Sequence, residues 1–338
     1  MGTDVADSNT VLVTGGAGYI GSHAVLALLE AGRKPVVVDD LSTGRRELVP
    51  EGVPLIVGDV GDGALMRRVL AEYRCGAVMH FAGSIVVPES VTDPLSYYRN
   101  NTCASRSLIE ACVAAGVSRF IFSSTAAVYG EPEAVPVAEE AALRPISPYG
   151  TSKLMTEWML RDVAATGALR YVALRYFNVA GADALGRSGQ ASPKATHLIK
   201  VAAEAVTGKR EAVTVFGDDY PTPDGTGIRD YIHVCDLAEA HVLALSYLER
   251  GAPSDVMNCG YGHGFSVRQV LDAMMAVADR PITLHMGPRR DGDPAELVSN
   301  PAKIRRVLAW TPRRDDLREI VASALAWERR LQDAPGAA

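Results

Sequence analysis

Short runs of consecutive apolar residues recur along the first half of the chain, and longer amphipathic segments separate them. Uninterrupted apolar runs are typical of strands buried on both faces, and here they cover residues 10–14, 35–38, 55–59, 77–83, 119–124 and 169–177. Apolar residues at helical spacing lie between these runs, at 22–30, 63–73, 100–115 and from Pro148 onward. Strands that alternate with helices predict an α/β fold with a doubly wound parallel sheet.

Beyond Asn178 this alternation loosens. Segments 181–193 and 217–227 are rich in Gly, Pro and Asp, and shorter helices and strands alternate between them. We therefore expect two domains, 1–178 with the parallel sheet and 179–338 as a smaller mixed α/β domain with long binding loops. Part of 229–250 is expected to pack back on the first domain.

A glycine-rich turn follows the first predicted strand directly. Gly15, Gly18 and Gly21 lie between that strand and the next predicted helix, and the second strand ends at Asp39. This strand, turn and helix form a dinucleotide-binding pattern of the Rossmann type, in which the backbone approaches a pyrophosphate and the helix N-terminus offers amide donors. Asp39 would accept hydrogen bonds from the adenosine ribose and repel a 2'-phosphate, so the sequence predicts NAD rather than NADP.

Further residues of the same unit are predicted to contact NAD. Asp59, after the third strand, is placed to reach the adenine, and residues 81–83 to lie along the cofactor, although turn chemistry and sheet packing would explain them equally well. The remaining predicted cofactor contacts are Tyr19, Ile20, Asp40, Val60, Phe81, Ala82, Gly83, Asn100, Lys153 and Phe177.

Tyr149 and Lys153 are the candidate proton-transfer pair. A helix that starts after Pro148 places the phenol and the ammonium one turn apart on one face. A nearby cation favours the phenolate and lowers the pKa of the phenol, so Tyr149 is the predicted general base. The spacing alone also fits an ordinary amphipathic helix. Thr125 adds a hydroxyl at the end of a predicted strand, where ligands bind in open α/β folds.

Composition excludes several classes of partner. The formal net charge is −6, with no basic face in prospect, which argues against nucleic-acid or anionic-membrane partners. Five cysteines without a Cys-x-x-Cys pair argue against a disulfide framework and a zinc site, and we expect no metal. No signal region or run of about 20 apolar residues is present, which predicts a cytoplasmic protein.

The glycine turn, Thr125 and the Tyr-x-x-x-Lys spacing together resemble the extended short-chain dehydrogenase/reductase family. Within it the chain is similar to the UDP-glucose (UDP-galactose) 4-epimerases, from about residue 11 to 327, through stretches that include 120–130, 147–153, 174–178, 216–234 and 289–294. The resemblance implies that Tyr149 takes the proton from the sugar 4-hydroxyl while NAD accepts hydride from C4. Lys153 would bind the nicotinamide ribose and lower the pKa of Tyr149, and Thr125 would bond the 4-oxygen. The 4-keto sugar then turns over and hydride returns to its other face.

The resemblance also implies a UDP-sugar site in the second half. Its predicted contacts, besides Thr125, are Asn178, His197, Leu198, Thr214, Phe216, Arg229, Arg290 and Asp293. Read without the family, these are surface ion pairs, turn residues and core residues. Ile85 stands where some members have a lysine near the cofactor, and Leu297 at a position whose size influences whether N-acetylated sugars fit.

Two other functions share these features. Nucleotide-sugar 4,6-dehydratases need an Asp-Glu pair directly after the threonine, where this chain has Ala126 and Ala127. A non-catalytic NAD-sensing protein would not need Thr125, Tyr149 and Lys153 together. Epimerisation of other UDP-sugars, such as UDP-GlcNAc or UDP-xylose, stays open. The family implies a homodimer through helices 100–115 and 149–165, whose apolar side chains would otherwise pack against the sheet.

Overall fold

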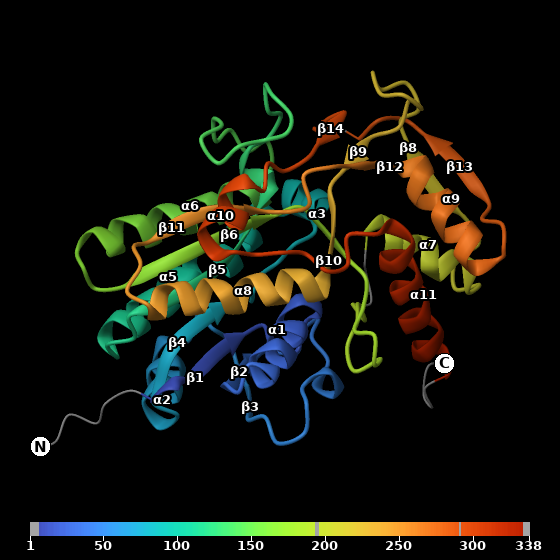
Figure 1. Cartoon of the computed structure of the whole chain (residues 1–338). Helices are drawn as coiled ribbons and strands as arrows, with labels where there is room; N and C mark the ends of the chain where they lie inside the picture. The colour runs from blue at the N-terminus through green and yellow to red at the C-terminus, as the bar shows by residue number, and fades with distance from the viewer. Residues whose placement is uncertain (1–6, 193–195, 291, 334–338) are drawn as a thin grey trace, which may run out of the picture. The chain divides into compact units, whose positions relative to one another are not determined.

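The computed structural model describes residues 7–192, 196–290 and 292–333, and the largest sheet within these ranges has seven strands (Figure 1). The strand order is β11-β6-β5-β4-β1-β2-β3. Pairs β3–β2, β2–β1, β1–β4 and β4–β5 are parallel. This order confirms the predicted doubly wound fold, because the chain reverses direction across the sheet at β1 and β4. The strands are β1 Asp7–Thr14, β2 Lys34–Asp39, β3 Leu55–Val57, β4 Cys75–His80, β5 Arg119–Thr125, β6 Arg170–Tyr176 and β11 Asp255–Cys259.

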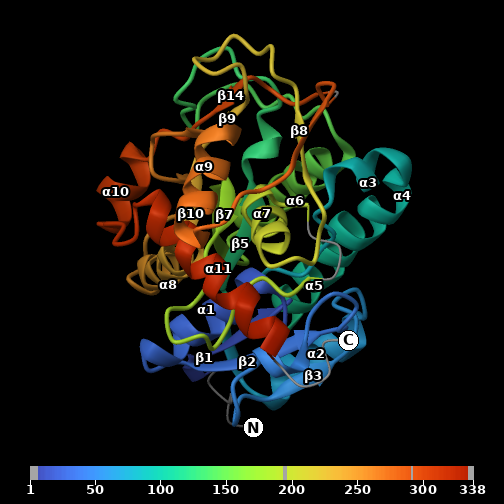
Figure 2. The ribbon, with the colours of Figure 1, turned by 90° about the vertical axis from the view of Figure 1, so that its right-hand side faces the viewer.

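Helices cover both faces of the sheet. One face packs on α2, α5 and α6 through a continuous apolar core that includes Leu12, Phe120 and Leu108. On the other face lie α1 and α8, as Figures 1 and 2 show. The helices of this part are α1 Tyr19–Glu30, α2 Gly63–Glu72, α3 Val87–Thr92, α4 Pro94–Tyr97, α5 Ala104–Ala114, α6 Pro148–Ala165 and α8 Val234–Glu249, with short 3-10 turns at Arg46–Leu48 and Ala126–Val128.

The predicted helix over 100–115 is interrupted. Residues Tyr98–Cys103 form a π-helical segment, and a regular α-helix, α5, begins only at Ala104. A π-helical turn widens the backbone spiral and is common at functional sites. The strand predicted over 77–83 is also shorter, because β4 ends at His80 and leaves 81–83 as a loop.

The chain folds into two compact units. Unit 1 comprises 1–128, 145–175 and 238–257, and unit 2 comprises 129–144, 176–237 and 258–338. Segment 238–257 thus belongs to the unit of the large sheet.

Unit 2 contains three small sheets and four helices among its described residues. The sheets are β10-β7, β12-β9-β14 and β13-β8. The elements are β7 Asn178–Ala180, α7 Leu198–Val206, β8 Val213–Phe216, β9 Ile228–Arg229, β10 Tyr231–His233, β12 Phe265–Ser266, α9 Val267–Ala278, β13 Leu284–Gly287, β14 Glu296–Leu297, α10 Ala302–Leu308 and α11 Leu317–Asp333.

Short strands leave unit 2 dependent on buried polar anchors. The carboxylate of Asp230, fully buried, accepts hydrogen bonds from the Ser299 hydroxyl at 2.6 Å and from the backbone N–H groups of Tyr261 and Gly262 at 2.9 and 3.1 Å. These bonds tie β9 and β10 to two loops that are distant in sequence. A buried carboxylate satisfied in this way fixes loop positions that apolar contacts alone would leave variable.

We predict that Leu108→Ala lowers the free energy of unfolding by about 2–4 kcal/mol, because Leu108 is completely buried between α5 and the sheet. Leu185, which is 72% exposed, supplies the matched control, and Leu185→Ala should change stability by less than about 0.5 kcal/mol. Urea unfolding of both variants measures the difference. Equal midpoints would contradict the placement of Leu108 in the core.

Candidate active site

The glycine turn after β1 brings backbone segments closer than side chains would allow. A Cβ on Gly21 would stand 2.1 Å from the carbonyl oxygen of Gly15. Gly15 has φ +70°, and a Cβ there would stand 2.6 Å from the backbone nitrogen of Ala82. No side chain caps the N-terminus of α1, which begins at Tyr19. An uncapped helix start behind a turn of glycines and one alanine fits the pyrophosphate of a dinucleotide.

Asp39, at the end of β2, is fixed against this turn. Its two carboxylate oxygens accept hydrogen bonds from the backbone N–H groups of Ala17 and Leu41, each at 2.9 Å. Burial raises the pKa of Asp39, and the two hydrogen bonds oppose that shift. Because a carboxylate has about four acceptor positions, two remain for ribose hydroxyls. The residues present therefore fit an NAD adenosine.

Several of the other predicted cofactor residues lie directly after β2, β3 and β4. The loop after β4 adjoins the glycine turn, since Phe81 donates its N–H to the carbonyl of Thr14 at 3.0 Å. The Phe81 ring also packs on His241, with centroids 4.8 Å apart. The carboxylates of Asp40 and Asp59 both accept backbone N–H bonds in local turns, at 2.9 and 2.7 Å. Asp59 therefore has the role in a local turn that was the alternative to a contact with the adenine.

The remaining predicted cofactor residues differ in exposure. Tyr19, Ile20 and Ala82 are half-buried, Val60 is part of the core, and Phe177 is buried in unit 2, directly before β7. Asn100 is exposed and donates to the Ser84 hydroxyl at 3.2 Å.

Thr125, Tyr149 and Lys153 meet at the carboxyl end of β5. Ser147 caps α6 by accepting the N–H of Gly150 at 3.2 Å, and Pro148 occupies the first turn, so the helix places Tyr149 at its start. The Thr125 hydroxyl accepts the N–H of Ala127 at 3.1 Å, which leaves its proton for the bond to Tyr149. The predicted grouping of the three side chains is therefore present.

Gly150 explains how α6 approaches so closely. A Cβ there would stand 2.6 Å from the carbonyl oxygen of Ala127. Any other residue would push the start of α6, and Tyr149 with it, away from the end of β5.

The expected direction of the Tyr149 pKa is wrong for this structure. Burial raises the pKa of Tyr149, and the hydrogen bond from Thr125 only partly opposes it. Desolvation disfavours the phenolate more than the sequence spacing indicated. Burial also lowers the pKa of Lys153 to about 8. Its Nζ donates to the carbonyl oxygen of Ser123 at 3.1 Å and lies 5.1 Å from the centroid of the Phe122 ring.

A clamp that the sequence did not reveal holds the loop after Gly83. Asn101, in the π-helical segment, accepts the N–H of Ser84 at 2.8 Å and donates to its carbonyl at 3.0 Å. Tyr97, one turn earlier, makes the corresponding bonds to Val86. Its hydroxyl accepts the Val86 N–H at 2.9 Å and donates to the Val86 carbonyl at 2.7 Å. The two side chains thus satisfy the backbone N–H and carbonyl groups of Ser84 and Val86, as the backbone of a neighbouring strand would.

The amide of Asn101 also joins this loop to α6. It donates to the Ser152 hydroxyl at 3.0 Å, next to Lys153. No short motif identifies Asn101, because its partners are 17 and 51 residues away.

The predicted substrate residues of unit 2 lie in four places. Arg229 is paired with Asp293, and its strand partner in β14 is Leu297. The Arg290 guanidinium lies over the ring of Phe216 at 3.9 Å, and Thr214 shares β8 with Phe216. His197 directly precedes α7, which begins at Leu198; its Nδ1 lies 2.6 Å from the side-chain nitrogen of Gln190. Asn178 begins β7 and donates its N–H to the carbonyl of Asp230 at 2.9 Å.

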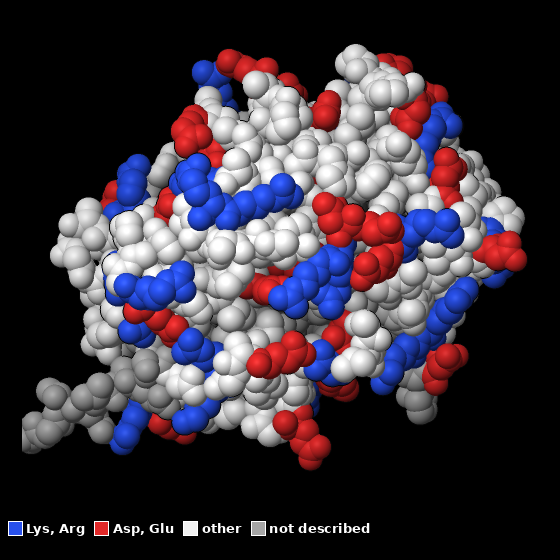
Figure 3. All heavy atoms as spheres, viewed as in Figure 1, with Lys and Arg blue, Asp and Glu red and all other residues white. Residues whose placement is uncertain are grey.

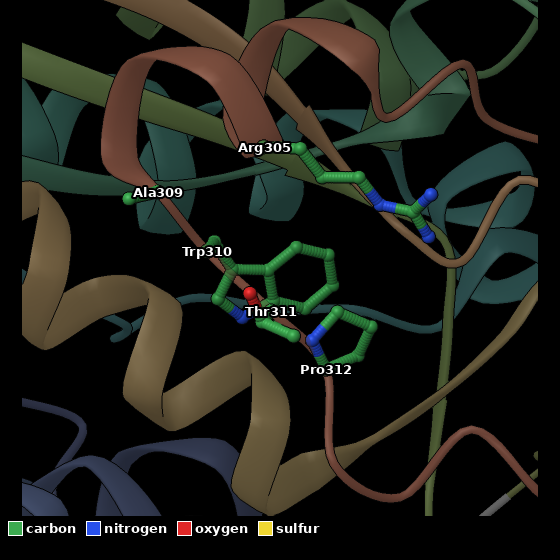
Figure 4. Close-up of a pocket in the computed structure, with 5 residues that line it drawn as sticks. All are labelled: Arg305, Ala309, Trp310, Thr311 and Pro312. Atoms are coloured by element: carbon green, nitrogen blue, oxygen red, sulfur yellow. The ribbon is translucent and has the colours of Figure 1, made fainter.

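A surface pocket elsewhere in unit 2 contains none of these residues. It has a volume of about 500 Å³ and is lined by Arg305, Ala309, Trp310, Thr311 and Pro312 (Figure 4). It is therefore separate from the predicted sites.

Surface charge, possible metal ligands and helix length were compared with the partners considered from the sequence. On the face in Figure 3, Lys and Arg side chains are interspersed with Asp and Glu. Among residues 7–192, 196–290 and 292–333, no group of three or more His, Cys, Asp or Glu is placed to hold a metal ion. No helix in these ranges is long and apolar enough to cross a membrane.

Comparison with known proteins identifies the family of this chain. Residues 11–260 match the model of the NAD dependent epimerase/dehydratase family. The chain belongs to that family, and NAD is its cofactor. It is 58% identical to a UDP-glucose 4-epimerase of Azospirillum brasilense, over 100% of this chain and 97% of that protein.

Solved structures are similar over nearly the same length. The UDP-glucose 4-epimerase of Brucella ovis in complex with NAD has a TM-score of 0.92 at 44% identity, and the match covers 94% of this chain and 98% of that one. The enzyme of Bifidobacterium longum in complex with NAD+ and UDP has a TM-score of 0.91 at 39% identity, with 96% and 99% covered.

Proposed function

We propose that this protein interconverts UDP-glucose and UDP-galactose by reversible epimerisation at C4, with NAD that stays bound through the cycle. The observation that carries the proposal is the cluster of Thr125, Tyr149 and Lys153 at the end of β5, in a chain similar over its length to UDP-glucose 4-epimerases. Galactose metabolism is the corresponding pathway.

Tyr149 is the group that removes and returns the proton of the sugar 4-hydroxyl. Thr125 is oriented to donate its hydroxyl proton, because its oxygen already accepts the N–H of Ala127. A donor held in this way stabilises negative charge that develops on the 4-oxygen or on the phenol. The 4-keto sugar is the intermediate between the two epimers.

Lys153 supplies positive charge beside the phenol. With a pKa of about 8, its ammonium form predominates at neutral pH and is lost as the pH rises through 8. The glycine turn and Asp39 hold the cofactor. When bound, NAD provides the hydride acceptor and a positive ring that favours the phenolate. In the protein itself, the hydrogen bond from Thr125 opposes the effect of burial on the Tyr149 pKa.

In unit 2, we assign the UDP moiety to the residues that the family resemblance implied. A guanidinium fork suits paired phosphate oxygens, so Arg229 and Arg290 bind the pyrophosphate and nucleotide. Asp293 binds the uridine ribose. Because Arg229 and Asp293 pair with each other, substrate binding replaces that ion pair by contacts to the ligand. Asn178, His197, Leu198, Thr214 and Phe216 complete the site.

The dehydratase alternative lacks its acid and base. Ala126 and Ala127 form the 3-10 turn after Thr125, and neither side chain transfers protons. We also propose that the chain forms a homodimer. The cytoplasmic location stays a prediction.

Incubation of the protein with UDP-galactose, without added NAD, should yield UDP-glucose until both epimers are in equilibrium. Parallel reactions with UDP-GalNAc and UDP-xylose define the range of sugars, which Leu297 is expected to influence. Chromatography of the nucleotide sugars identifies the products. Absence of interconversion at every enzyme concentration, in protein that contains NAD, would refute the proposed reaction.

Tyr149→Phe should reduce turnover by about 10²-fold or more, because the ring packs as before but no longer transfers a proton. Folding and NAD content should stay unchanged. Tyr73→Phe, at the end of α2, serves as the matched loss of a hydroxyl and should behave as wild type. If Tyr149→Phe turned over at a near-normal rate, Tyr149 would not be the base.

The dimer proposal has a separate test. Of the two helices that the family implies for the dimer, 149–165 corresponds to α6, which carries the exposed Trp158. The neighbouring α3 and α4, which lie beside α6 in Figure 2, add the exposed Val91 and Leu95 to the proposed surface. Trp158→Glu should shift the protein to a monomer in sedimentation velocity, whereas Leu185→Glu, at an exposed leucine of unit 2, should not. A wild-type monomer at micromolar concentration would disprove the dimer.

A further inference from the structure

A third residue of the Tyr149 and Lys153 helix face contacts the same strand. Glu157 follows Lys153 by four residues, so all three side chains lie along one face of α6. Each meets a different one of the last three residues of β5. Tyr149 bonds to the Thr125 hydroxyl, Lys153 to the Ser123 carbonyl at 3.1 Å, and Glu157 accepts the Ser124 hydroxyl at 2.5 Å.

We propose that Glu157 and Ser124 form a positioning pair that fixes α6 on the end of β5 and thereby sets Tyr149 against Thr125. The proposal rests on the role of Tyr149 in the proposed epimerisation. Neither Glu157 nor Ser124 is placed to touch the substrate, because both side chains are buried and bonded to each other.

Arg175 on β6 compensates the negative charge of the buried Glu157 carboxylate. Its Nε and Nη2 donate to the two oxygens of Glu157 at 3.0 and 2.6 Å, and the side chains are only 5% and 4% exposed. A buried ion pair contributes little net stability compared with apolar residues of similar volume. Its effect here is geometric, since the guanidinium holds the carboxylate in one orientation toward Ser124.

The position of Ser124 makes this geometry matter. It lies between the carbonyl that holds Lys153 and the threonine that bonds to Tyr149. Ser124 and Phe122, two residues apart, both face α6, where the Phe122 ring also contacts Lys153. A misplacement of about 1 Å between reacting groups can cost about 10²-fold in rate, so a small shift of β5 against α6 is sufficient to slow the reaction.

Ser124→Ala is the cleanest test, because it leaves the Glu157–Arg175 pair intact and creates no orphaned charge. With UDP-galactose as substrate, kcat should fall about 5- to 20-fold while KM stays unchanged, a fraction of the loss that full misplacement produces. Ser90→Ala, which removes another fully buried hydroxyl, bonded to the carbonyl of Val87, is the control. The unfolding midpoints of the two variants should be similar.

A second test measures the pKa of Tyr149, in the kcat profile and, without substrate, by titration. The Thr125 hydrogen bond lowers the pKa of Tyr149, so a weaker bond in Ser124→Ala should raise that pKa and move the acid limb of the kcat profile to higher pH. Phenolate absorbance, as the difference between each protein and its Tyr149→Phe counterpart, measures the pKa directly. The titratable groups nearby are the same in both proteins: Tyr97 on α4, Lys153 on α6, and His80 on β4, which interacts with Lys153.

The double variant Glu157→Leu with Arg175→Met separates position from stability. It should fold with stability close to wild type and lose as much turnover as Ser124→Ala, and addition of Ser124→Ala to it should have no further effect. Wild-type kcat and an unchanged Tyr149 pKa in Ser124→Ala would overturn the positioning role. If wild-type protein fails to epimerise any UDP-sugar, the proposed function fails, and the phenolate titration still decides the positioning role.

Discussion

The removal of Tyr149 and Lys153 from water is the constraint on which the rest of this structure depends. Both side chains are almost completely buried. Burial raises the pKa of Tyr149 and lowers the pKa of Lys153, so in each case the charged form is disfavoured. Fixed dipoles of the protein take the place of water. The Thr125 hydroxyl bonds to the phenol of Tyr149, and the Ser123 carbonyl accepts a hydrogen bond from the ammonium of Lys153. Such dipoles need no reorganisation during the reaction. Their value depends on the accuracy with which α6 meets β5, which Gly150 makes possible.

In the predicted cofactor site, too, buried hydrogen bonds and close backbone contacts hold polar groups in fixed positions. Gly15 and Gly21 allow backbone segments to touch, and the Asp39 carboxylate joins that turn to the end of β2. A buried polar chain continues from Thr14 through His80 to Ser105, with distances of 2.7 and 2.8 Å. Burial and the nearby Lys153 lower the pKa of His80 to about 3, so the imidazole stays neutral and acts as a rigid hydrogen-bonding link.

Periodicity was sufficient for six of the seven strands of the large sheet, β1 to β6, because burial on both faces leaves uninterrupted apolar runs. It missed β11, which lies beyond Asn178, where no further strand of this sheet was predicted. It was also sufficient for Tyr149, Lys153 and Thr125, whose grouping follows from one helix and one strand end. Asn101 and Glu157 could not be found in this way, since their partners come from other elements. The pKa of Tyr149 was mispredicted because a four-residue spacing reveals the neighbouring charge but not the loss of hydration. In unit 2, short strands carry little periodic signal, so the family resemblance alone pointed to Arg229 and Asp293, and their pairing with each other was not foreseen.

The clamp of Tyr97 and Asn101 has a consequence for how this family can vary. The backbone groups of Ser84 and Val86 are held by side chains from a neighbouring helical segment, while the intervening Ile85 is half exposed. The path of the loop therefore does not depend on which side chain stands at 85. A lineage can exchange a charged residue for an apolar one there in a single step, without any compensating change in the fold. The residue at 85 can thus change without moving the loop that Asn101 joins to α6.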